Sequence, residues 1–266
     1  MDSYFINSEL LQDFDLEKFK KNEPFPWFNF HSFLTPEAFS ELYLDFPSFE
    51  LFEKHMGIDR YGQRPHNRYY LAYENTIYTY LYRERGEGIA KREDLPIPWQ
   101  RFIDELETNQ VYDNFIKSVF DVKHYNVRYA WHLGFNTSEV SPHRDSERKI
   151  GTHIFYFNTS DDWDINWGGS TLVLGGKLTT SQNPDFDDFT VVKSCQITDN
   201  NSFLFKNTAN AWHGVKTLTC PAGKFRRLFN IIYEFPRVPE SPKEINSISP
   251  LIVGKSFLKR LLKKLS

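Results

Sequence analysis

Three residues of this 266-residue chain have the types and spacing needed to hold a metal ion. His143 and Asp145 are two positions apart, so in an extended strand their side chains point to the same side. His213, further along the chain, supplies a second imidazole. Two histidines and one carboxylate form the facial triad that binds non-haem iron(II) and leaves coordination positions open. Because a His-x-Asp pair often arises by chance, this interpretation depends on the surrounding sequence.

Further motifs follow in a fixed order around these residues. They are Gly134 to Asp145, the expected strand 153–158, Trp163 to Leu174 with Trp167-Gly168-Gly169, His213-Gly214-Val215, and Gly223 to Leu228 with Arg226-Arg227. Over roughly residues 120–236 this order resembles the Fe(II)- and 2-oxoglutarate-dependent dioxygenases, particularly their prolyl-hydroxylase-like branch. The ordered set is far more specific than any single motif in it.

The resemblance implies a reaction and its cofactors. The family uses iron(II), 2-oxoglutarate and O2, with ascorbate as an optional reductant, and hydroxylates its substrates with release of succinate and CO2. It makes His143, Asp145 and His213 the expected iron ligands. The carboxylate argues for oxygen insertion or desaturation over halogenation, because the related halogenases lack it. The substrate stays open between a small molecule, a sugar and an amino-acid or peptidyl side chain, since fold does not fix substrate.

The distal carboxylate of 2-oxoglutarate calls for a cation, and arginine can bind it through two parallel hydrogen bonds. Arg226 and Arg227 are both candidates, but strand alternation sends only one inward, and we favour Arg226. Where the family often has Arg-x-Ser, this chain has Leu228, which removes one hydroxyl contact. Tyr156 stands where related enzymes use a tyrosine for the same carboxylate. Trp131 is a further candidate for this pocket, although a core position is more usual for tryptophan.

Other residues near the motifs have structural interpretations. His153 has the wrong spacing for a metal ligand and is expected to be a structural histidine of its strand. Trp163 and Trp167 are expected to pack around a turn at Gly168-Gly169, where the backbone needs a positive φ or a close approach.

Composition excludes several function classes. The net charge of −3 and pI near 6.3 do not favour nucleic-acid binding. Two cysteines, Cys195 and Cys220, form no disulfide framework, and a reducing compartment suits iron(II). Residues 1–4 show no signal-peptide pattern, and no stretch reaches the roughly 18 apolar residues of a membrane span. We therefore expect a cytoplasmic protein.

The pattern of apolar residues predicts a mainly β fold with flanking helices (α+β). Residues 123–236 alternate in short strands that two facing sheets would close into a double-stranded β-helix, a jelly-roll or cupin-like barrel. Residues 1–122 are expected to add an edge strand and N-terminal helices packed on one sheet of the same domain. Residues 237–266 are expected to be a linker and a basic amphipathic helix.

Several alternatives remain open. The helix expected at 255–266 suits peripheral contact with an anionic membrane, or packing on its own domain or another subunit of a homo-oligomer. The basic loop 57–68 suits a lid over the barrel mouth or an ordinary solvated loop. Two functions compete with oxygenation: a catalytically silent jelly-roll binding module, and a non-redox metal-dependent barrel such as a sugar isomerase.

Overall fold

The computed structural model describes residues 4–56, 66–74 and 88–236. Residues Met1–Phe235 form one compact unit. The expected helix at 255–266 and most of the basic loop 57–68 lie outside the described residues. None of the described helices has both the length and the apolar composition needed to cross a bilayer.

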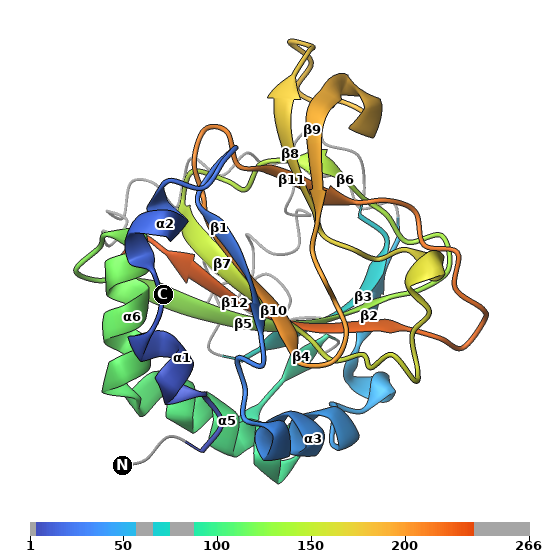
Figure 1. Ribbon diagram of the computed structural model, residues 1–266. Helices are drawn as coiled ribbons and strands as arrows, with labels where there is room; N and C mark the ends of the chain where they lie inside the picture. Colours follow the sequence, from blue (N-terminus) through green and yellow to red (C-terminus); the bar gives the residue numbers. More distant parts are fainter. Residues whose placement is uncertain (1–3, 57–65, 75–87, 237–266) are drawn as a thin grey trace, which may run out of the picture. The chain divides into compact units, whose positions relative to one another are not determined.

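Two mainly antiparallel sheets face each other in this unit, as the sequence predicts (Figure 1). The large sheet has the order β1-β10-β7-β12-β5-β3-β2, with β4 paired to β3, and the small sheet has the order β6-β11-β8-β9. The strands of the large sheet are β1 (Trp27–His31), β2 (Glu53–His55), β3 (Arg68–Tyr73), β4 (Ile89–Ala90), β5 (Asn126–Gly134), β7 (Lys149–Tyr156), β10 (Asn201–Lys206) and β12 (Arg226–Glu234). The strands of the small sheet are β6 (Val140–His143), β8 (Leu172–Lys177), β9 (Phe189–Ser194) and β11 (Trp212–Val215).

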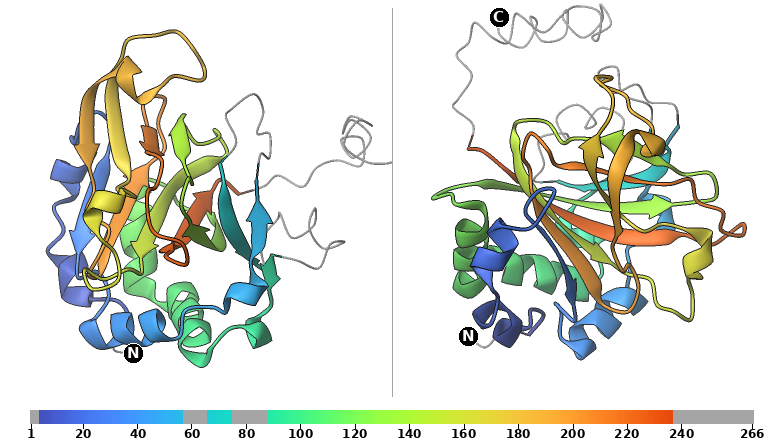
Figure 2. Two further views of the ribbon diagram at one scale, coloured as in Figure 1. Left: turned by 90° about the vertical axis from the view of Figure 1, so that its right-hand side faces the viewer. Right: turned by 45° about the horizontal axis from the view of Figure 1, so that its top comes forward.

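The α-helices of the described residues cover the outer face of the large sheet (Figure 2). They are α1 (Ser8–Gln12), α2 (Leu16–Lys20), α3 (Pro36–Leu44), α5 (Ile97–Thr108) and α6 (Gln110–Phe120). Helix α3 begins with a side-chain cap: the Thr35 hydroxyl accepts a hydrogen bond from the amide of Ala38, and Pro36 is at the first helical position. Helices α5 and α6 meet at Asn109, whose side chain caps α6 by accepting from the amides of Val111 and Tyr112.

Both faces of the large sheet are buried, and strand alternation assigns each side chain to one of them. On β5, Tyr129, Trp131 and Leu133 join the core beneath the helices. On β12, Phe229, Ile231 and Tyr233 do the same. The alternate positions point between the two sheets, where Tyr156, Phe203, Phe205 and Leu228 of the large sheet meet Val173 and Val215 of the small one. This interior holds the candidate site.

Candidate metal centre

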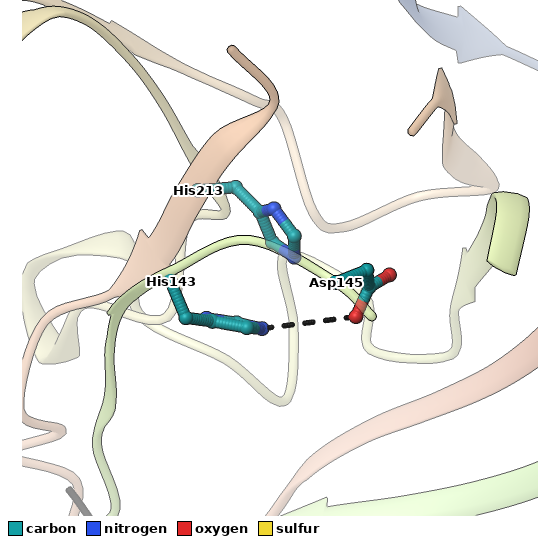
Figure 3. A group of neighbouring side chains, drawn as sticks. All are labelled: His143, Asp145 and His213. Carbon is teal, nitrogen blue, oxygen red and sulfur yellow. Dashed lines mark ion pairs between the residues drawn. The ribbon is translucent and has the colours of Figure 1, made fainter. Parts of the chain in front are cut away.

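The structure brings the three predicted metal ligands together inside the barrel (Figure 3). One ligand atom from each of His143, Asp145 and His213 can be chosen so that all three lie within 4.8 Å of one another. His143 Nε2 lies 4.0 Å from Asp145 Oδ1, and the two imidazole centroids are 4.3 Å apart. Among the described residues this is the one group of His, Cys, Asp or Glu that meets such a criterion.

Strand pairing places the two histidines. His143 on β6 is the direct register partner of His213 on β11, but the next partners are Val140 and Val215. Three steps along β6 therefore match two steps along β11, so β6 carries a bulge. Pro142 falls in this bulge, where its missing N–H does not interrupt a ladder. The bulged, proline-containing strand thus determines the direction in which the His143 side chain points.

Each imidazole is oriented by a backbone carbonyl. His143 Nδ1 lies 3.0 Å from Ser141 O, and His213 Nδ1 lies 3.0 Å from Ala211 O. A carbonyl can only accept, so Nδ1 is the protonated nitrogen and Nε2 keeps its lone pair for a metal. Burial lowers the pKa of both histidines, and neighbouring imidazoles lower that of His143 further. Both rings are therefore in the neutral form that binds metal.

Asp145 lies beyond the end of β6, two residues after His143, rather than within the strand. Burial opposes its ionisation, but the Lys149 ammonium, together with His213 and His143, outweighs burial, and the carboxyl pKa lies well below its usual range. Lys149 Nζ donates to Asp145 Oδ1 at 2.5 Å, and Thr152 Oγ1 donates to Oδ2 at 3.4 Å. Two neutral imidazoles and one carboxylate are the donor set that non-haem iron(II) accepts, so the residues present fit this metal.

Arg226 points into the barrel interior, on the face of β12 that strand alternation assigns to it. It is buried, and its Nη2 donates to Thr171 Oγ1 at 3.1 Å. The Thr171 hydroxyl also bonds the Tyr156 hydroxyl at 2.7 Å, and the guanidinium lies 5.2 Å from the Tyr156 ring centroid. Within the described residues, Arg226 has no carboxylate partner and its Nε has no hydrogen-bond acceptor. A buried cation left in this state is suited to an anionic ligand.

Burial lowers the pKa of Arg226, although a guanidinium stays charged at neutral pH. Burial also raises the pKa of Tyr156, so its hydroxyl remains protonated and can donate. Thr171 was not predicted as a site residue. Its signal in the sequence is its place two residues after Gly169, on the segment that leads into β8.

Arg227 lies on the other face of β12 and does not join this cluster. Its guanidinium forms an ion pair with Asp162 and lies 4.4 Å from the Tyr43 ring centroid. The inclusion of Arg227 among co-substrate residues is therefore not supported by its position. The pairing instead ties β12 to the helix-side layer.

The prediction that Trp131 lines the co-substrate pocket is wrong. Trp131 is fully buried beneath the helices, with its ring centroid 5.3 Å from that of Trp99 and 4.9 Å from that of Phe229. The neighbouring His132 points inward instead and lines the barrel cavity. Trp131 is on the opposite face because successive strand residues alternate.

The two remaining histidines near the motifs have different places. His153 is a buried structural histidine, as predicted, with Nδ1 3.2 Å from the Tyr112 hydroxyl and Nε2 3.0 Å from the Ser202 hydroxyl. His66 was placed only in the basic loop, yet it is buried with its ring centroid 4.9 Å from that of His143. Nothing in the local sequence signals that contact.

The glycine turn also follows the prediction. Gly168 and Gly169 have φ of +83° and +96°, and Trp163 donates to the Gly168 carbonyl at 3.0 Å. A Cβ atom on Gly169 would lie 3.0 Å from Arg226 Cδ. This turn therefore lets the backbone approach the arginine closely.

A cavity of about 30 Å³, partly open to solvent, adjoins Arg226 in the barrel interior. It is lined by both sheets, including Arg226, Leu228 and His132 of the large one and Val140 and Val215 of the small one. The two valines are on the strands that carry His143 and His213. The cavity thus lies between the buried arginine and the strands of the triad.

No family model matches this chain, and neither does any curated protein. Solved structures do. A prolyl-4-hydroxylase from Pseudomonas putida shares 11% identity at a TM-score of 0.53, covering 85% of this chain and 100% of that one. A Trichoplax adhaerens prolyl hydroxylase, solved with a hypoxia inducible factor peptide, shares 13% at 0.54, covering 86% and 90%.

A third structure widens the range of reactions on this fold. The non-heme alpha-ketoglutarate-dependent epimerase SnoN, from nogalamycin biosynthesis, shares 13% identity at a TM-score of 0.51 and covers 82% of each chain. At these identities the likeness speaks for the fold. The chain has the jelly-roll fold of the prolyl-4-hydroxylases and other 2-oxoglutarate- and iron(II)-dependent oxygenases.

Proposed function

We propose that this protein is an iron(II)- and 2-oxoglutarate-dependent oxygenase that hydroxylates a small molecule, a sugar or an amino-acid or peptidyl side chain. The observation that carries the proposal is a pairing of two sites within one barrel. The triad His143, Asp145 and His213 has ligand atoms within 4.8 Å of one another, and the buried cation Arg226 has no carboxylate partner among the described residues. Each site alone has ordinary structural explanations, whereas the two together match a metal and an anionic co-substrate.

Different residues of the chain would bind the metal and the co-substrate. His143, Asp145 and His213 would hold iron(II), which when bound would supply the redox chemistry by which O2 oxidises both 2-oxoglutarate, to succinate and CO2, and a substrate C–H bond. Arg226 would take the distal carboxylate through its Nε and a terminal nitrogen. Thr171, which contacts both Arg226 and Tyr156, would supply the hydroxyl that Leu228 lacks.

The barrel interior would also keep water from the reacting groups. Both sheets contribute apolar side chains around the site, and the Phe205 ring centroid lies 4.7 Å from that of His213. Low polarity strengthens the hydrogen bonds of Arg226 to a carboxylate. The same seclusion protects the oxidising steps from side reactions.

The test is an anaerobic titration of 2-oxoglutarate into iron(II)-loaded protein, followed by visible absorption. We expect a weak metal-to-ligand charge-transfer band that is absent from a His213→Ala variant. A His124→Ala variant, which changes an exposed histidine, should keep the band. If iron(II) binds without producing a band, the oxygenase proposal fails, and a silent or non-redox metal barrel becomes the better account.

Hydroxylation as the outcome needs a second measurement. The SnoN likeness shows that an epimerase also uses this fold. Succinate formed per oxygen consumed, with candidate substrates of each class, would reveal coupling. A substrate that raises succinate release and gains an oxygen atom would support hydroxylation, whereas one that is converted without gaining oxygen would contradict it.

A further inference from the structure

The two kinds of metal ligand are held in place by different means. His143 and His213 are in paired strands, and their rings are fixed by the carbonyls of Ser141 and Ala211. Asp145 does not belong to a paired strand, because β6 ends at His143. The loop that follows is anchored by Asn207, whose side chain donates to the carbonyls of Ser146 and Lys149. The groups that orient the Asp145 carboxylate itself must therefore be side chains.

Two side chains hold the Asp145 carboxylate, one on each oxygen. Lys149 Nζ donates to Oδ1 at 2.5 Å, and Thr152 Oγ1 donates to Oδ2 at 3.4 Å. The Lys149 and Asp145 side chains are only 21% and 8% exposed, so water screens their attraction weakly. Oδ1 is also the oxygen 4.0 Å from His143 Nε2 (Figure 3). The carboxylate is thus turned with one oxygen toward the imidazoles.

This orientation matters because carboxylates bind metals through one oxygen or through two. Two imidazoles and one oxygen leave three of six positions open on an octahedral metal. A second oxygen would occupy one of them. A 2-oxoglutarate chelate uses two positions and O2 needs a third, so a two-oxygen aspartate would block the proposed reaction.

We propose that Lys149, assisted by Thr152, keeps Asp145 to a single metal-facing oxygen and thereby keeps a coordination position open. Lys149 is a positioning residue in this account, since it acts through Asp145. The inference rests on the proposed function. Partners of metal-bound carboxylates commonly orient their ligands in this way.

The test counts waters on bound manganese(II) by water-proton relaxation, which does not depend on turnover. In a Lys149→Met variant the carboxylate is free to turn, and we expect the relaxation enhancement per bound metal to fall by about one third, from three open positions to two. Lys149→Arg keeps the charge and the donor and should restore the wild-type value. Arg148→Met removes an exposed neighbouring cation and should change nothing.

The outcomes separate this inference from the proposed function. If wild-type protein binds no manganese(II), the metal centre itself fails. If wild type and Lys149→Met bind manganese(II) with equal relaxation enhancement, the role of Lys149 is overturned while the metal centre stands. Should Lys149→Met not fold by circular dichroism, Lys149→Gln supplies the same comparison, because it removes the charge and keeps a polar side chain.

Discussion

His143 and His213 are direct cross-strand partners in the antiparallel pair β6–β11, with their ring centroids 4.3 Å apart. Their Nδ1 atoms are already occupied by backbone carbonyls, so the two Nε2 atoms are presented before any ligand arrives. Because strand register already places the two histidines, little free energy is spent on organising them when a metal binds. The metal should therefore stabilise a fold that exists without it.

The first prediction concerns that stabilisation. Manganese(II) at roughly one hundred times its Kd should stabilise the native protein by about 2.7 kcal/mol, because it binds only the folded site. Thermal unfolding with and without the metal measures the gain. The Asp145→Ala and His213→Ala variants should lose it, and His124→Ala should keep it. An equal shift in all four proteins would mean that the metal binds elsewhere.

The two adjacent arginines give a matched pair. Arg226→Leu should weaken 2-oxoglutarate binding by about 2–5 kcal/mol, since it removes a buried charged donor from an anion. Arg227→Leu breaks an ion pair with Asp162 on the other face, where both side chains are about one-fifth exposed. Discounted for solvent screening, this should cost at most about 1 kcal/mol of stability and leave 2-oxoglutarate binding unchanged.

The charge-transfer band, titrated with 2-oxoglutarate, provides the measurement for both arginine variants. Urea unfolding supplies the stability of each. A loss of 2-oxoglutarate affinity in Arg227→Leu comparable to that in Arg226→Leu would contradict the assignment. It would show that the effect passes through β12 as a whole.

The sequence predicted the triad well because its motifs are local. His143 and Asp145 are separated by one residue, and the glycine turn and the distal histidine follow in an order that random sequence rarely produces. The sheets were also predictable, since turns and alternating apolar residues mark each strand. Strand alternation predicted that only one of Arg226 and Arg227 points inward, and the resemblance to the family's Arg-x-Ser pattern favoured Arg226.

It was harder to predict from the sequence to which face of the large sheet each side chain points. The large sheet is buried on both sides, by helices on one and by the barrel interior on the other, so hydrophobicity does not tell the two faces apart. Trp131 was placed in the pocket for that reason. Thr171 and His66 were missed because their partners lie on other strands. Strand register determines those contacts, and a single sequence does not specify register.

The third prediction uses the glycine turn. Gly168 and Gly169 both have positive φ, so an alanine at either position carries backbone strain, on the order of 1–3 kcal/mol. Only at Gly169 would the added methyl meet Arg226, 3.0 Å from its Cδ, whereas at Gly168 no such neighbour lies closer than 3.8 Å. Gly169→Ala should therefore weaken 2-oxoglutarate binding several-fold more than Gly168→Ala. Equal affinities in the two variants would show that Arg226 is free to move aside.

The last prediction concerns acid stability and His153. Burial lowers the pKa of this histidine well below its usual value, so the folded protein keeps it neutral while the unfolded chain takes up a proton below about pH 6.5. The contribution of His153 to the free energy of unfolding is therefore lost as the pH falls. The free energy of unfolding should decline with falling pH less steeply in His153→Gln, by up to about 1.4 kcal/mol per pH unit.

Urea unfolding of metal-free protein between pH 7.5 and roughly 5 provides this slope. His143 and His213 are buried as well and should contribute to the pH slope in the same direction. The slope of the variant is therefore compared with that of the wild-type protein, which is itself not zero. A variant of the exposed His124 serves as the control for replacing a histidine. If His153→Gln shows the wild-type slope, His153 must be protonated in the native protein, with the Tyr112 or Ser202 hydroxyl accepting from the charged ring.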